Sequence, residues 1–219
     1  MDPSCKATRV AFVNYKGVLD GGILVALSDG RVQILDPEDG DVMEEEQVHT
    51  AQVNRISFNT EKTLLFTASA DCNAKMVDAE TLEVLKVYET DRPVNAIVPH
   101  PSKDHILLGG GQDAMSVTTT SGRVGKFECR FFEAIYKNEI GRVKGHFGPI
   151  NAIGINPDGR SYASGAEDGY IRLHHFDRGT KDMFHDPFLS ILLLLLSPHP
   201  TVNIFVARPL SSRLHRNGR

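Results

Sequence analysis

The sequence predicts an all-β protein built from repeated four-stranded units. Three observations carry this prediction: short runs rich in Val, Ile, Thr and Phe, turn signals between the runs, and a repeat of about 42 residues along the 219-residue chain. Runs of this kind, bounded by Asp-Gly, Asn-Pro and Pro-Asp-Gly turns, are typical of β-strands. A helical alternative is disfavoured because the successive glycines 109–111 would each cost about 1 kcal/mol relative to alanine in a helix.

Four segments share one pattern, in which an apolar run ending in small residues is followed by an aspartate and then by an alternating strand. They read ILVALSD-GRVQIL, LLFTASAD-CNAKMV, ILLGGGQD-AMSVTT and SYASGAED-GYIRLH, with the turn aspartates Asp29, Asp71, Asp113 and Asp168. Successive aspartates lie 42, 42 and 55 residues apart, so the last interval contains an insertion. A period of about 40–45 residues with four short strands is typical of a β-propeller blade. We therefore expect a partial β-propeller of about four blades, each a four-stranded antiparallel sheet, whose small residues let neighbouring blades approach closely.

Two repeats carry a histidine 22 residues before the turn aspartate. His49 stands at this spacing before Asp71, and His146 stands at the same spacing before Asp168. This arrangement resembles the WD-repeat family, in which a loop histidine, a turn aspartate and a strand hydroxyl form a buried hydrogen-bonded relay. The resemblance implies a structural relay made by the following residues: His49, Thr67, Asp71, Asp113, His146, Ser164 and Asp168.

The relays are incomplete by the standard of that family. The chain has no Trp, and the resemblance puts Leu35, Val77, Thr119 and His174 in the place of the family's tryptophan. Thr90 occupies the histidine position of the repeat that contains Asp113.

Composition and charge exclude several classes of protein. The chain is 41% apolar and 24% charged with a net charge of −4, which excludes collagen, a disordered chain and a polytopic membrane protein. Residues 1–177 hold 18 Lys+Arg against 26 Asp+Glu, whereas residues 178–219 hold 6 against 2. We therefore divide the chain into propeller blades at 1–177 and a divergent, basic, Pro-containing tail at 178–219.

The tail contains the strongest apolar run, Phe188–Leu196. A membrane-spanning helix needs about 20 residues, so this run predicts no membrane crossing. It could form an added strand, a short buried helix or an irregular segment, and its leucines favour a helical or irregular turn. The segment TVNIFVAR that follows it is typical of a strand.

No chemistry of catalysis, metal binding or cofactor binding is recognisable. Cys5, Cys72 and Cys129 are far apart and form no CxxC pair, so they predict neither a zinc site nor a disulfide framework. Their reduced state fits an intracellular protein. The sequence shows no set of nucleophile, base and orienting residue. We expect no catalytic residue, no metal and no cofactor.

Four longer segments resemble a more specific family within the WD-repeat proteins. ETDRPVNAIVPHP, LLGGGQDAMSVTTT, GRVGKFECRFFEAIYKNEIGRVKGHFGPIN and PDGRSYASGAEDGYIRLHHFD resemble the C-terminal blades of the family of subunit i of eukaryotic translation initiation factor 3. The resemblance runs from about Thr8 to Asp177. It implies a cytoplasmic, non-enzymatic scaffold that supports translation initiation by protein–protein binding. It also implies partners: the b and g subunits, with a C-terminal helix of the former, and indirectly the small ribosomal subunit.

The resemblance leaves a second hypothesis open. A member of that family has seven blades and an aromatic, acidic ending, whereas this chain matches only the last four blades and ends in a basic segment. The alternative function is therefore that of a truncated fragment of the propeller, either non-functional or regulatory, with exposed blade faces that favour self-association.

Acidic residues predict a surface for a partner. Asp78, Glu80 and Asp91 bracket the connection that follows the second repeat, where a helix carrying Arg or Lys could dock. Complementary charge would set its orientation more than its affinity.

The insertion interleaves basic and aromatic residues, a pattern found in RNA-binding surfaces. Glu128, Glu133 and Glu139 offset half of its positive charge, and Phe131 and Phe132 fit packing under an outer hairpin. We therefore expect no direct RNA contact.

Overall fold

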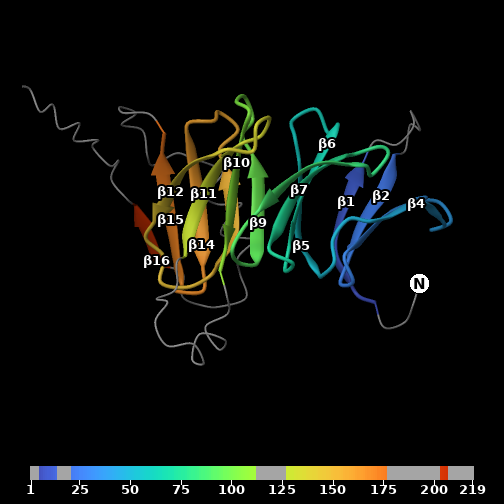
Figure 1. Cartoon of the computed structure of the whole chain (residues 1–219), viewed down its shortest axis with the longest axis horizontal. Helices are drawn as coiled ribbons and strands as arrows, with labels where there is room; N and C mark the ends of the chain where they lie inside the picture. Colours follow the sequence, from blue (N-terminus) through green and yellow to red (C-terminus); the bar gives the residue numbers. More distant parts are fainter. Residues whose placement is uncertain (1–4, 14–20, 112–126, 177–202, 207–219) are drawn as a thin grey trace, which may run out of the picture.

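The computed structural model describes residues 5–13, 21–111, 127–176 and 203–206. These residues form 16 β-strands in four sheets of four strands, which confirms the all-β prediction. The sheets follow one another in chain order, from the blue first sheet to the orange and red last sheet (Figure 1). The first and last sheets lie at opposite ends of this row, so the blades do not close into a ring (Figure 1).

The first two sheets are each made of four consecutive antiparallel strands. The first has the order β1-β2-β3-β4 and the second the order β5-β6-β7-β8. Their bounds are β1 Ala7–Val13, β2 Gly22–Leu27, β3 Arg31–Leu35, β4 Val42–Gln47, β5 Val53–Phe58, β6 Leu64–Ser69, β7 Asn73–Asp78 and β8 Val84–Glu89.

The third and fourth sheets repeat this order with two differences from the expected blade. The strands are β9 Val94–Pro99, β10 His105–Gly110, β11 Glu128–Glu133, β12 Glu139–Lys144, β13 Ile150–Ile155, β14 Ser161–Ala166, β15 Tyr170–His175 and β16 Asn203–Val206. The third sheet is antiparallel throughout. In the fourth sheet β16 runs parallel to β15, not antiparallel as predicted. A parallel neighbour needs a long connection, and residues 176–202 supply the length that a hairpin lacks.

The third sheet takes its third strand from an unexpected segment. The repeat predicted a strand directly after Asp113, but the strand that pairs with β10 is β11. Asp113 and the predicted strand at 114–119 lie outside the described residues. The extra residues of the long repeat thus precede the third strand of this sheet.

Turn hydrogen bonds identify the equivalent positions of the second and third sheets. The backbone N–H of Asp78 donates to the carbonyl five residues later at 2.9 Å, and the N–H of Glu133 makes the same bond. Phe132 in the third sheet is therefore the equivalent of Val77. Thr119, which the sequence put in that place, lies outside the described residues.

Hydrophobic clusters lie between neighbouring sheets. At the contact of the third and fourth sheets, a Cβ added to Gly109 would lie 2.7 Å from side-chain carbons of both Ile150 and Ile153. Contacts this short require a neighbour to shift, so the missing side chain of Gly109 lets these strands approach as they do. The small residues of the repeat therefore serve close approach, as expected.

Side chains also tie the innermost strands together. The Thr8 hydroxyl on β1 donates to the Val53 carbonyl of β5 at 2.7 Å. The Asn54 amide on β5 donates to the Val94 carbonyl of β9 at 3.0 Å. Because each bond crosses from one sheet to the next, it holds the blades in register.

Candidate functional site

The second sheet brings together three of the predicted relay residues. His49 lies before β5 with only 1% of its surface exposed. Its Nδ1 donates to Asp71 Oδ2 at 3.0 Å, and the Thr67 hydroxyl donates to Nε2 at 2.8 Å. Backbone N–H groups of Thr50 and Asn73 donate to the same carboxylate at 3.1 and 2.9 Å. The network links the loop before β5, the middle of β6 and the β6–β7 turn.

The fourth sheet repeats this network with a serine. His146 Nδ1 donates to Asp168 Oδ2 at 3.0 Å, and the Ser164 hydroxyl donates to His146 Nε2 at 2.9 Å. The backbone N–H groups of Phe147 and Tyr170 donate to Asp168 at 2.9 and 3.0 Å. The two networks match atom for atom, which places His, hydroxyl and Asp at equivalent points of two blades.

Burial sets the protonation of both networks. It lowers the pKa of His49, although the negative charge of Asp71 acts to raise it. Burial acts to raise the pKa of Asp71, but His49 and the backbone donors outweigh it and hold that pKa below its ordinary value. The same directions hold for His146 and Asp168. At neutral pH each network therefore pairs a neutral imidazole with a carboxylate.

The order hydroxyl, imidazole, carboxylate is also that of a catalytic triad. Ser164, His146 and Asp168 have this arrangement, and the sequence predicted these three residues as a structural relay, not as a catalytic set. Yet Ser164 and Thr67 are 0% exposed. A hydroxyl with no surface cannot meet a substrate in this conformation, so the geometry suits a structural link.

Within the described part of the first repeat, no such network surrounds the turn aspartate. Asp29 Oδ1 instead accepts the backbone N–H of Arg31 at 3.1 Å, and Oδ2 pairs with the guanidinium of the same residue at 2.6 Å. Of the predicted relay residues, Asp113 lies outside the part of the chain that the structure describes, so its role stays a prediction.

The third sheet has Thr90 at the histidine position, as predicted. The N–H of Thr90 donates to the Cys72 carbonyl at 2.9 Å, and the N–H of His49 donates to the Gly30 carbonyl at the same distance. Leu108 stands in β10 where Thr67 stands in β6, since each is the fourth residue of its strand. The third sheet therefore has no imidazole at position 90 and no hydroxyl at position 108.

The acidic residues predicted to bind a partner do not form one cluster. Asp78 ends β7, and its Oδ1 accepts the backbone N–H groups of Glu80 and Thr81, both at 2.9 Å. The N–H of Thr81 is the main cause that lowers the pKa of Asp78. Asp91 follows β8, so it lies at the opposite end of that strand, with 62% of its side chain exposed and Arg130 Nη1 at 3.3 Å.

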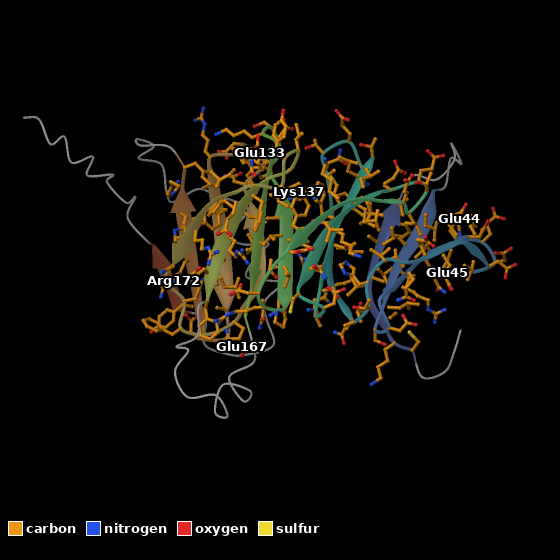
Figure 2. All side chains as sticks on the ribbon, viewed as in Figure 1. Glu44, Glu45, Glu133, Lys137, Glu167 and Arg172 are labelled. Carbon is orange, nitrogen blue, oxygen red and sulfur yellow. The ribbon has the colours of Figure 1, made fainter. Side chains whose placement is uncertain are left out.

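The labelled residues of Figure 2 show which turns lie at each end of the sheets. Glu133 and Lys137, in the β11–β12 hairpin, lie at the upper end, and Glu167, beside a relay aspartate, lies at the lower end. Turns between third and fourth strands thus lie opposite the relay turns. Asp78 belongs to the upper end and Asp91 to the relay end, since β8 joins the two.

A network of ion pairs on β11 and β12 was missed in the sequence. Arg130 pairs with Glu139 at 2.6 Å, and Arg142 pairs with Glu139 and, at 3.3 Å, with Glu128. Part of the signal was present, because Glu128 and Arg130 on one segment and Arg142 and Lys144 on the other are two residues apart and so share a face. The pairs place carboxylates beside Arg130 and Arg142, and the absence of RNA contact stays a prediction.

No group of three or more His, Cys, Asp and Glu side chains in the described ranges is placed to hold a metal ion. Those ranges also contain no helix with the length and apolarity needed to cross a membrane.

Known proteins are similar to this chain over most of its length. The EIF3I family model matches residues 2–186. "Eukaryotic translation initiation factor 3 subunit I" of Danio rerio is 49% identical over 173 residues, which cover 79% of this chain and 53% of that protein. The proteins of the same name from Nematostella vectensis and Homo sapiens are 49% and 48% identical, over 76% and 74% of this chain and 52% and 50% of theirs. The chain spans about half the length of these relatives.

Proposed function

Because the chain belongs to the family of subunit I of eukaryotic translation initiation factor 3, we propose that it is a non-enzymatic scaffold subunit of that complex. It supports translation initiation by binding other proteins in the cytoplasm. The observation that carries the proposal is the match over residues 2–186, which contain β1 through β15 and therefore nearly the whole of the described fold.

The chemistry of the two relays supports a scaffold over an enzyme. Each of their hydroxyls is fully buried, and each carboxylate already accepts backbone N–H groups as well as the imidazole. A polar network in which every member is satisfied rigidifies its surroundings. In this proposal His49, Thr67 and Asp71, like His146, Ser164 and Asp168, hold loops in place for partners to recognise.

The partner surface of the proposal runs along β8, the edge strand of the second sheet. Glu80 lies before this strand and Asp91 after it. Six residues of strand extend over about 20 Å, so a helix of about 13 residues, at 1.5 Å per residue, would reach from one acidic end to the other. A C-terminal helix of the b subunit with basic residues near both of its ends fits this spacing, and the g subunit is the second expected partner.

Co-purification with the b subunit tests the surface. The double variant Glu80→Lys, Asp91→Lys reverses charge at both ends of β8, and we expect at least tenfold weaker binding at low salt because like charges then face each other. Asp78 is left intact since its carboxylate holds the β7–β8 turn. The control is Glu46→Lys on the exposed part of β4, which should bind as the wild type does. Equal binding by all three proteins would refute the β8 surface.

Size-exclusion chromatography of the same mixtures tests the scaffold itself. A single complex of fixed stoichiometry is the expected result. Large heterogeneous species without the b subunit would favour the alternative of a non-functional or regulatory fragment. Contact with the small ribosomal subunit should then require the other subunits, and isolated RNA should not bind directly.

A further inference from the structure

Phe147 is the most exposed large apolar side chain of the described residues, with 84% of its surface exposed. It directly follows His146, which is only 8% exposed. The backbone N–H of Phe147 donates to Asp168 Oδ2 at 2.9 Å. The relay of the fourth sheet therefore anchors the loop that presents this ring to solvent.

An exposed glutamate lies beside the same loop. Glu167 stands in the turn between β14 and β15, and its backbone N–H donates to the Pro149 carbonyl at 3.0 Å. A Cβ added to Gly148 would lie 3.2 Å from the Cβ of Glu167. The backbone next to Phe147 thus contacts the Glu167 side chain, so the ring and the carboxylate belong to one surface at the lower end of the sheets (Figure 2).

A chain of amide side chains holds one oxygen of Glu167. Asn151 Nδ2 donates to Glu167 Oε1 at 3.3 Å, and Asn95 Nδ2 donates to Asn151 at 3.0 Å. Asn54 Nδ2 extends the chain to Asn95 at 3.2 Å. Among the described residues Glu167 Oε2 has no hydrogen-bond partner. A carboxylate that is already oriented binds a donor at a smaller cost in ordering.

The second sheet lacks this pair of side chains. Thr50 occupies the position of Phe147, since each donates its backbone N–H to the relay aspartate of its sheet. Ala70 occupies the position of Glu167, since each directly precedes that aspartate. The relay therefore requires neither the ring nor the carboxylate, which are specific to the fourth sheet.

The chain itself shows what a phenylalanine and a glutamate can bind together. The guanidinium of Arg130 lies 5.1 Å from the centroid of the Phe132 ring and pairs with Glu139 at 2.6 Å. A guanidinium can stack on an aromatic face and donate from its edge to a carboxylate, whereas the compact ammonium of lysine suits this pair of contacts less well.

The charges of this surface favour a cation. Glu167 and Asp168 carry two negative charges, and Arg172, which lies over the Tyr170 ring at 5.8 Å, carries one positive charge. One added positive charge would balance the three groups.

We propose that Phe147 and Glu167 form a docking site for an arginine side chain of a partner protein. The guanidinium lies across the Phe147 ring and donates to the free oxygen of Glu167. The site is on the fourth sheet, so it is separate from the β8 surface and does not depend on binding there.

Titration of the full chain with a capped Gly-Arg-Gly peptide tests the proposal by ¹H–¹⁵N NMR at pH 7. We expect saturable shifts confined to the amides of Phe147, Gly148 and Glu167–Gly169, with a Kd of roughly millimolar size because both contacts are exposed. Capped Gly-Lys-Gly should bind about threefold more weakly. Capped Gly-Glu-Gly should cause no localised shift.

Two variants assign the contacts. Phe147→Ala and Glu167→Gln should each weaken binding of the arginine peptide about threefold, and both change exposed side chains, so the fold should persist. Thr50→Ala, at the equivalent position of the second sheet, is the matched control and should bind as the wild type does. Absence of a localised shift well above millimolar peptide, equal binding of the three peptides, or unchanged binding in either Phe147→Ala or Glu167→Gln overturns the proposal.

Discussion

Tyr162 and His174 stack face to face, with ring centroids 4.7 Å apart and 14° between the ring planes. Burial, with nearby His146, Arg172 and His175, lowers the pKa of His174 to about 4. The stack therefore holds a neutral imidazole of β15 against a ring of β14 in the last sheet, and it makes the fold sensitive to acid.

The stability of the protein should fall as the pH decreases from about 6.5 toward 4. Burial lowers the pKa of His49, His146 and His174 in the fold, whereas the unfolded chain binds protons near pH 6.5. The stabilisation that the neutral histidines give the fold is thus complete above pH 6.5 and is lost as the pH falls from 6.5 toward 4. For His174 alone we expect a loss of about 1 to 2 kcal/mol in the free energy of unfolding between pH 7 and pH 5. Urea denaturation at both pH values measures it.

His174→Phe is the matched control for that measurement. Phenylalanine keeps an aromatic ring against Tyr162 but cannot take up a proton. The pH dependence between 7 and 5 should become shallower in this variant. An unchanged slope would show that His174 does not contribute.

Loss of a relay histidine should destabilise the fold strongly. His146→Ala leaves Asp168 and Ser164 without the imidazole that joins them, and we expect a loss of about 2 to 4 kcal/mol. Ser164→Ala removes one hydrogen bond and should cost about 1 kcal/mol. Chemical denaturation at pH 7 gives both values. The half-buried His105, replaced by alanine, is the reference and should change stability by about 0.5 kcal/mol or less; a loss at His146 no larger than this would contradict the relay.

The contact of the third and fourth sheets should not accept a methyl group at Gly109. Gly109→Ala places a Cβ against Ile150 and Ile153, so we expect a loss of about 1 to 3 kcal/mol from overpacking. Gly141→Ala, which meets nothing within 4 Å, should be nearly neutral. The second-site change Ile153→Val removes one of the clashing carbons and should restore part of the loss. Thermal unfolding of the four proteins tests the set, and similar melting temperatures would count against close packing here.

Tyr88 should link the second and third sheets through its hydroxyl. It is 1% exposed, its ring packs edge-on against Phe132 at 6.0 Å, and its hydroxyl donates to the Ala134 carbonyl at 2.7 Å. Tyr88→Phe keeps the ring contact and removes the bond, so we expect about 1 kcal/mol of lost stability. Equal stability of the two proteins in urea would show that water replaces the bond at no cost.

Regular repeats and short-range chemistry made much of the fold predictable. The 42-residue spacing of Asp29 and Asp71 reflects two equal blades, and a shared 22-residue spacing of His and Asp marked both networks. Such features are local: alternation selects a strand, Asp-Gly selects a turn, and small residues near Gly109 allow sheets to approach.

Pairing between distant segments decided the rest. Residues 114–119 alternate more regularly than residues 128–133, yet the latter pair with β10, and Phe132 packs in the hydrophobic cluster shared with the second sheet. The parallel course of β16 and the separation of Asp78 from Asp91 likewise depend on contacts between residues far apart in the chain. Local pattern specifies each strand, but the free energy of packing one sheet on the next determines which strands become neighbours.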